Sequence, residues 1–188
     1  MRIIAGKAKG RKLEAPPGIK TRPITDMIKE ALFNILSAKV PDSIFLDLYA
    51  GSGSVGIEAL SRGAAKAVFV DNDHQAIKVL HQNLAKCGLQ GEVYRSDVFD
   101  FLKRAVRNKL TFDIIYADPP FTQSSLFERT LHSLDNDELL NSGGVIIIRV
   151  PRKSELTSRL NWIELEREKA YGESVLYFYR SIKEGGSI

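Results

Sequence analysis

The chain has 188 residues, of which 44% are apolar, so it is long enough for one domain with a sizeable core. Its net charge of +4 and its single cysteine, Cys87, exclude a strongly acidic protein and a disulfide within the chain. No apolar stretch has the length of a signal peptide or a membrane span, so we expect a cytoplasmic protein without a membrane partner. We also expect a monomer.

Positive charge is concentrated at the amino terminus. Residues 1–23 hold seven basic residues and one acidic residue, a charge of +6, whereas the remaining 20 basic and 22 acidic residues sum to −2. We therefore divide the chain into a basic arm, 1–23, and a folded domain, 24–183. A basic block favours a nucleic-acid partner, and a solvated tail is the alternative. The candidate nucleic-acid contacts are Arg2, Lys7, Lys9, Arg11, Lys12 and Arg22.

The first helical pattern begins at Thr25, a suitable N-cap that follows Pro23 closely. Apolar residues then recur at helical spacing, namely Ile28, Ala31, Leu32, Ile35 and Leu36. This spacing predicts a helix that packs one face on the core.

The apolar run 44–48 stops at a glycine-rich turn and is followed at once by a helical pattern. Gly51, Gly53 and Gly56 match the G-x-G-x-x-G spacing, in which two glycines allow positive φ and the third allows close packing of helix and strand. The next strand ends in Asp71, twenty residues after Gly51, where a carboxylate can accept both hydroxyls of a ribose. Together these features predict a nucleoside-containing cofactor, and a glycine turn followed by a chance acid is the alternative.

Helices and strands then alternate along the chain, which predicts an α/β fold with a mostly parallel, doubly wound sheet. The expected helices are 55–62, 73–87, 98–106 and 124–134, and the expected strands are 67–71, 92–95, 112–117 and 144–150. The end differs, because the strands 162–169 and 174–180 are joined by only four residues and must run antiparallel. This arrangement resembles the Rossmann-like class I fold of S-adenosylmethionine-dependent methyltransferases more than that of the all-parallel dehydrogenases.

The strand 112–117 runs directly into Asp118-Pro119-Pro120-Phe121. Ligands of open α/β sheets bind beyond the carboxyl ends of the strands, so this tetrapeptide and the glycine loop should face one cavity. Two prolines remove two backbone donors, so the tetrapeptide presents acceptors beside a flat aromatic ring. Asp118 and the Pro119 carbonyl can accept from a planar amine while Phe121 stacks on a flipped base. A rigid surface turn is the alternative.

Other polar residues follow strand ends. Asp97 can accept from an adenine amino group and can equally cap the next helix, and Asp47 can face the ammonium of a methionine moiety. The candidate cofactor-binding residues are Asp47, Tyr49, Gly51, Ser52, Gly53, Gly56, Asp71, Asn72, Asp97 and Val98. No histidine or cysteine spacing fits a zinc pattern, so no metal is expected.

Six runs carry a resemblance to a known family. They are Thr21-Arg22-Pro23-Ile24-Thr25-Asp26, Glu30-Ala31-Leu32-Phe33-Asn34, Ala50-Gly51-Ser52-Gly53, Gly56-Ile57-Glu58-Ala59-Leu60-Ser61-Arg62-Gly63-Ala64, Asp118-Pro119-Pro120-Phe121 and Tyr171-Gly172. Over nearly the whole chain they resemble the RsmD family, bacterial methyltransferases of a small-subunit ribosomal RNA guanine at N2. Met27 and Lys29 stand where that family often has arginines, and Lys29 keeps the charge.

The resemblance implies S-adenosylmethionine as cofactor, S-adenosylhomocysteine as product, and 16S ribosomal RNA, free or within an assembled small subunit, as the partner of the arm. We therefore expect methyl transfer to the exocyclic N2 amine of a guanine, with Asp118, Pro119 and Phe121 as catalytic residues. A nicotinamide dehydrogenase is one alternative, because the glycines and Asp71 alone permit it. The others are a DNA adenine-N6 or protein glutamine methyltransferase and a noncatalytic RNA-binding module.

Overall fold

The structure, a computed structural model, describes residues 1–17, 24–136 and 138–182. The expected RNA contact Arg22, the expected boundary at residue 23 and residue 183 lie outside these ranges. The strands are β1 (Ile44–Leu48), β2 (Lys66–Asp71), β3 (Glu92–Arg95), β4 (Phe112–Ala117), β5 (Leu140–Pro151), β6 (Ile163–Tyr171) and β7 (Ser174–Ser181). The helices are α1 (Asp26–Ile35), α2 (Ser54–Ser61), α3 (His74–Cys87), α4 (Val98–Arg107) and α5 (Ser125–Leu134). Within the described ranges, no helix has the length and apolar character needed to cross a membrane.

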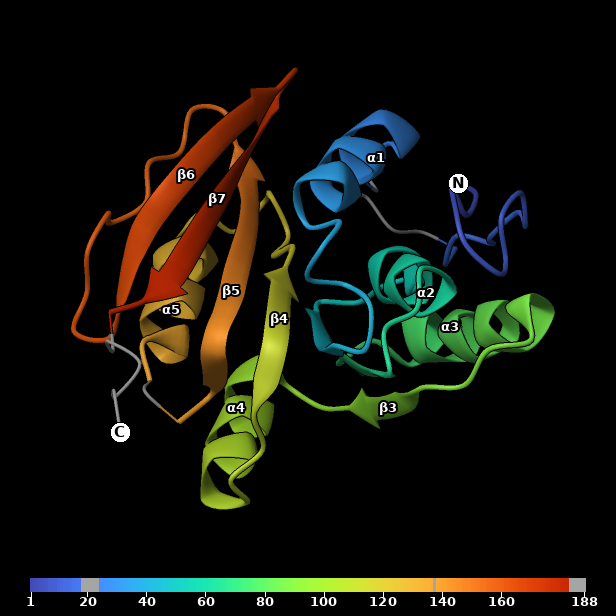
Figure 1. Ribbon diagram of the computed structural model, residues 1–188, viewed down its shortest axis with the longest axis horizontal. Helices are drawn as coiled ribbons and strands as arrows, with labels where there is room; N and C mark the ends of the chain where they lie inside the picture. The colour runs from blue at the N-terminus through green and yellow to red at the C-terminus, as the bar shows by residue number, and fades with distance from the viewer. Residues whose placement is uncertain (18–23, 137, 183–188) are drawn as a thin grey trace.

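The strands form one sheet in the order β3-β2-β1-β4-β5-β7-β6 (Figure 1). Strands β1 to β5 run parallel, whereas β7 runs antiparallel between β5 and β6. This order and the antiparallel end confirm the class I methyltransferase fold that the alternation and the short last connection predicted. Thr25 caps α1 as expected, because its hydroxyl accepts from the Ile28 N–H.

Two apolar layers enclose the sheet. Helices α1, α2 and α3 cover one face, and α4 and α5 cover the other (Figure 1). In β1, Phe45 packs toward the first layer and Leu46 toward the second, because side chains alternate along a strand. The central strands are therefore apolar on both sides, as in other sheets covered by helices on both faces.

The strand order reverses between β1 and β4. From β1 the chain proceeds outward to β3, and it then returns to build β4 and β5 on the other side. Leu48 and Ala117 are partners at the carboxyl ends of β1 and β4, so the residues that follow them begin two neighbouring loops. Such a switch point is where ligands of doubly wound sheets bind.

Residues 1–13 form a short antiparallel hairpin, here called the amino-terminal hairpin, that lies against α2 (Figure 1). Ile3 is buried, and the Glu58 carboxylate of α2 accepts from the backbone N–H groups of Ile4 and Ala5 at 2.8 and 3.0 Å. A Cβ at Gly6 would lie 1.8 Å from the Ser61 carbonyl oxygen, so this approach requires glycine. Residues 1–13 therefore do not form a solvated tail.

Lys29 is fully buried beneath this hairpin, although its charge was expected to replace that of a family arginine. Its Nζ donates to the Arg2 carbonyl at 2.7 Å and lies 3.6 Å from the Glu58 carboxylate. Burial lowers the pKa of Lys29, and Glu58 opposes that shift. Lys29 keeps the charge but cannot offer it to a phosphate, and Met27 beside it is exposed.

Candidate active site

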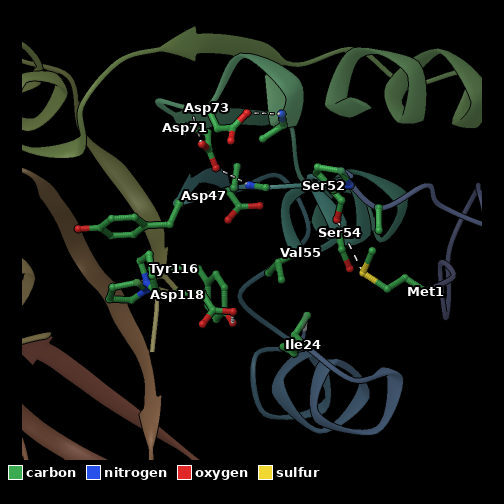
Figure 2. A pocket seen from close by; sticks show the side chains of 18 of the residues that line it. Met1, Ile24, Asp47, Ser52, Ser54, Val55, Asp71, Asp73, Tyr116 and Asp118 are labelled. Carbon is green, nitrogen blue, oxygen red and sulfur yellow. Dashed lines mark hydrogen bonds between the residues drawn. The ribbon is translucent and has the colours of Figure 1, made fainter. Parts of the chain in front are cut away.

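A cavity of about 380 Å³ opens at the carboxyl ends of β1, β2 and β4, at the switch point (Figure 2). This volume lies within the range of small-molecule sites, about 300–1,000 Å³. Met1 of the amino-terminal hairpin, Ala15 and Pro16 after it, and Ile24 just before α1 complete its wall. The lining residues are Met1, Ala15, Pro16, Ile24, Asp47, Tyr49, Ala50, Gly51, Ser52, Ser54, Val55, Asp71, Asn72, Asp73, Ala76, Tyr116, Asp118, Pro119, Pro120 and Phe121.

The glycine loop between β1 and α2 has the predicted geometry. Gly51 and Gly53 have φ values of +55° and +76°, which favour glycine. A Cβ at Gly56 would lie 2.3 Å from the Phe69 ring, so this residue permits close packing of helix and strand. Gly51 lines the cavity, whereas Gly53 and Gly56 do not.

Tyr49 begins the loop in a strained conformation. Its φ of +59° is uncommon for a residue with a side chain. Its hydroxyl shares a hydrogen bond of 2.8 Å with the Thr130 hydroxyl of α5, and burial raises the pKa of Tyr49. The Ala50 N–H donates to the Val70 carbonyl at 3.0 Å, so the loop is attached to β2 as well as to α5.

Asp71, at the end of β2, is fixed by backbone donors. Its Oδ2 accepts from the Gly51 N–H at 2.8 Å, and its Oδ1 accepts from the Asp73 N–H at 2.9 Å. Burial raises the pKa of Asp71, and these two hydrogen bonds oppose the shift. Each carboxylate oxygen has a second lone pair, so Asp71 can still accept from a ligand hydroxyl.

Asp47, near the end of β1, is 1% exposed, and Figure 2 shows it between Asp71 and Asp118. Its Oδ2 accepts from the Gly56 N–H at 2.8 Å, and its Oδ1 receives no hydrogen bond from the described part of the chain. Burial raises the pKa of Asp47 well above its usual range, and the nearby charges of Asp118 and Asp71 raise it further. A carboxylate in this position favours a cationic ligand.

Asp118, which follows β4, is held by side chains instead. Its Oδ2 accepts from an Arg149 Nη1–H at 2.7 Å and from the Tyr116 hydroxyl at 3.3 Å. Its Oδ1 receives no hydrogen bond from any described residue, and the side chain is 19% exposed. Burial raises the pKa of Asp118, and Arg149 opposes that shift. The free oxygen can therefore accept from a ligand in the cavity.

Arg149 also lies over the Phe121 ring, with its guanidinium carbon 4.8 Å from the ring centroid. Phe121 makes an edge-to-face contact with Phe127 of α5 at 6.3 Å. Arg149 was not among the predicted site residues. The sequence does contain a signal for it, because Arg149 interrupts the apolar strand run 145–150. An arginine buried in such a strand needs a polar partner.

The cavity wall is acidic. Asp47, Asp71, Asp73 and Asp118 line it, and no lysine or arginine side chain belongs to the lining given above. Met1 from the amino-terminal hairpin lies across from the glycine loop, and the Ser52 hydroxyl donates to its sulfur at 3.7 Å (Figure 2). Such a wall suits a ligand with net positive charge.

Asp97 and Val98 do not belong to this wall. Asp97 caps α4 instead, because its carboxylate accepts from the Phe99 and Asp100 N–H groups at 2.9 and 3.3 Å. Its predicted contact with an adenine remains a prediction. The described residues contain no group of three or more His, Cys, Asp or Glu side chains that could hold a metal ion.

The candidate RNA contacts lie on the amino-terminal hairpin. Arg2, Lys7, Lys9, Arg11 and Lys12 are all exposed. Arg2 forms an exposed ion pair of 3.2 Å with Asp26, whereas the other four form no ion pair within the described ranges. The hairpin therefore presents several cations beside one wall of the cavity.

A family model described as conserved hypothetical protein 95 matches residues 1–180. The chain is 36% identical over 190 residues to ribosomal RNA small subunit methyltransferase D of Escherichia coli strain K12, a match that covers 100% of this chain and 93% of that protein. A solved structure of a hypothetical protein from Thermus thermophilus has a TM-score of 0.81 and 32% identity, covering 95% of this chain and 98% of that chain. The structure of SMU.776 complexed with SAH shares the fold alone, with a TM-score of 0.64 and 16% identity, over 79% of this chain and 48% of that chain.

Proposed function

Because the chain belongs to the RsmD family, described as conserved hypothetical protein 95, we propose that it transfers a methyl group from S-adenosylmethionine to the exocyclic N2 amine of a guanine in 16S ribosomal RNA. One observation carries this proposal. The acceptor-only tetrapeptide lines the same acidic cavity as the glycine loop, and its Asp118 Oδ1 receives no hydrogen bond from a described residue. The name of the Escherichia coli relative supports the class of RNA, and the chemistry of the tetrapeptide supports the amine.

The residues of the cavity fit S-adenosylmethionine, whose sulfonium and ammonium groups give it a net positive charge. Asp71 would accept from the ribose hydroxyls, as the acid at this position does in related folds. Asp47 would face the ammonium, since its Oδ1 receives no hydrogen bond from a described residue. A Cβ at Gly51 would meet nothing nearer than 4.0 Å, so the ligand can approach the backbone closely there.

When bound, S-adenosylmethionine supplies an electrophilic methyl group on sulfur and leaves as S-adenosylhomocysteine. Asp118 Oδ1 accepts from one N–H of the guanine amine, and the Pro119 carbonyl accepts from the other. These acceptors make the nitrogen lone pair more available and stabilise the positive charge that develops on nitrogen. Asp118 Oδ1 then takes the proton that the methylated nitrogen loses, a role that its raised pKa suits.

Phe121 offers a flat surface for the base that carries this amine. Its ring is fixed between Arg149 and Phe127, so little freedom remains to be lost when a base stacks on it. A guanine within a helix must leave its stack to reach the cavity, and stacking on an aromatic ring compensates part of that cost.

The amino-terminal hairpin supplies the phosphate contacts in this proposal. Lys9, Arg11 and Lys12 are exposed and have no ion pair within the described ranges. Deleting the arm is a poor test, because it would also remove Met1 from the cavity wall and Ile3 from the core. Replacing these three residues by Gln should instead reduce the salt slope of RNA binding by about 2–3 and leave cofactor affinity unchanged. An unchanged slope would remove the hairpin from the RNA interface.

The decisive experiment is methyl transfer followed by nucleoside analysis. The protein is incubated with labelled S-adenosylmethionine and either undermethylated 16S RNA or small subunits, and the labelled nucleoside is identified. N2-methylguanosine is the expected product. In parallel reactions with DNA or protein as the acceptor, label on adenine or on glutamine would assign the site to another polymer. In a separate binding measurement, affinity for reduced nicotinamide would restore the dehydrogenase alternative. Cofactor binding with no transfer to any acceptor would favour the noncatalytic module.

A further inference from the structure

Arg149 is 2% exposed, and a guanidinium is almost never buried without partners. It lies in β5, beside the tetrapeptide, and does not itself line the cavity. In the parallel pair of β4 and β5, Ala117 is the partner of Ile148, so Asp118 and Arg149 come next on the two strands. This register brings the arginine directly beside the acid.

Contacts with three described residues, Asp118, Phe121 and Ser174, orient Arg149. Its Nη1–H donates to Asp118 Oδ2 at 2.7 Å, and its guanidinium covers the Phe121 ring at 4.8 Å. Its Nε–H donates to the Ser174 hydroxyl at 3.2 Å, at the start of β7. One side chain therefore connects both functional groups of the tetrapeptide to the antiparallel end of the sheet.

The tetrapeptide needs such support because its own backbone offers little. Pro119 and Pro120 have no N–H to donate, and the Asp118 N–H reaches the Leu48 carbonyl only at 3.4 Å. The positions of the Asp118 carboxylate and the Phe121 ring therefore depend on side-chain contacts, of which Arg149 makes the shortest.

We propose that Arg149 is a positioning residue for methyl transfer, which orients Asp118 so that Oδ1 faces the target amine and holds the Phe121 ring where the base stacks. This inference rests on the proposed function, since it concerns the same amine. Arg149 acts through Asp118 and Phe121 and touches neither the cofactor nor the base.

A purely structural arginine and a positioning arginine differ in their effect on the pH profile. The charged or titratable groups that face Asp118 are Arg149 from β5, Tyr116 from β4 and Asp47 from β1. Turnover requires the Asp118 carboxylate, so it falls when the pH drops through the pKa of that group. Removing the Arg149 charge should raise this pKa and move the acidic limb of the profile to higher pH by about 1–3 units.

The experiment compares Arg149→Met with Arg149→Lys. The Met variant should lose about 10²-fold in turnover, as misplacement of reacting groups does, while S-adenosylmethionine affinity measured by calorimetry stays unchanged. The Lys variant should keep the acidic limb near its normal position, because the charge is retained. It should lose about tenfold in turnover, because an ammonium cannot lie flat on Phe121 while bonding both polar partners. Arg180→Met is the matched control, since Arg180 forms an exposed ion pair with Glu164 in the same sheet.

Normal turnover and an unmoved acidic limb in Arg149→Met would overturn the inference. If circular dichroism shows that Arg149→Met does not fold, the test rests on Arg149→Lys. Wild-type turnover in Arg149→Lys would then overturn the inference. The proposed function fails separately, when the wild-type protein transfers no methyl group to guanine N2. A wild-type protein that makes N2-methylguanosine, together with an unaffected Arg149→Met, would refute only the role of Arg149.

Discussion

The two sides of the cavity hold their carboxylates in different ways. On the glycine-loop side, Asp47 accepts from a backbone N–H of α2, and Asp71 accepts from backbone N–H groups of the glycine loop and of the turn before α3. On the tetrapeptide side, Asp118 accepts from the side chains of Tyr116 and Arg149, the latter 31 residues away. Backbone donors are present whenever the loop folds, whereas side-chain donors depend on single residues. Substitutions on the tetrapeptide side should therefore have the larger consequences.

The largest effect is expected for Asp118→Ala, because it leaves the Arg149 guanidinium buried without its carboxylate. Breaking a buried ion pair from one side typically costs about 3–5 kcal/mol in the free energy of unfolding. Urea unfolding followed by circular dichroism measures this cost. The double variant Asp118→Ala/Arg149→Met should recover most of the lost stability, and a single variant as stable as the wild type would show that the pair is not needed.

Asp118→Asn is the better probe of catalysis, because an amide keeps the shape of the side chain. It should reduce turnover by about 10²–10³, since the positive charge that develops on the amine loses its carboxylate. Single-turnover measurements with labelled cofactor provide the rate, and calorimetry should find S-adenosylmethionine affinity nearly unchanged. Turnover close to that of the wild type would remove Asp118 from the mechanism.

On the glycine-loop side, Asp71→Asn should act on binding rather than on rate. Replacing a charged acceptor of the ribose hydroxyls by a neutral one should weaken the binding of S-adenosylmethionine by about 1.5–3 kcal/mol. Turnover at saturating cofactor should stay close to normal. The matched control is Asp135→Asn, since Asp135 also accepts from two backbone N–H groups, those of Asn161 and Trp162, and does not line the cavity. Equal losses in the two variants would argue against a specific role for Asp71.

The same contrast explains how far the sequence alone could lead. The glycine loop, Asp71 and the Thr25 cap have local signals, because each depends on residues nearby in the chain or on the period of one element. The β6–β7 hairpin was predictable because only four residues join its strands. The alternation of strands and helices predicted a mostly parallel, doubly wound sheet, whereas the strand order itself came from the structure.

The missed features all depend on contacts between distant segments. Met1 and Ile24 belong to the cavity wall only because the amino-terminal hairpin and α1 pack beside the glycine loop. A lysine is normally expected on the surface, and Lys29 is buried only because that hairpin covers it beside Glu58. Arg149 meets Asp118 through the register of β4 and β5, which the sequence does not specify residue by residue.

A smaller effect on the tetrapeptide side is expected for Phe121→Ala. Loss of the stacking surface should weaken the hold on the flipped base by about 1–3 kcal/mol, seen as a higher KM for RNA with little change in cofactor affinity. Phe112→Leu is the control, because Phe112 is a buried aromatic residue of β4 that does not line the cavity. A change confined to cofactor affinity would mean that Phe121 contacts the cofactor and not the flipped base.

The smallest effect is a gain in stability from Asp47→Asn. The folded pKa of Asp47 is raised, so the stability associated with this group is fully present below its unfolded pKa and is lost as the pH rises through the folded value. An Asn oxygen can still accept from the Gly56 N–H but carries no charge into the cavity. The cofactor-free variant should therefore be about 0.5–2 kcal/mol more stable at neutral pH, a common gain where a functional group is removed. Thermal unfolding from pH 4 to pH 8 should show the advantage growing with pH, together with weaker S-adenosylmethionine binding. A constant or shrinking advantage would mean that Asp47 is not a destabilising charge of the empty site.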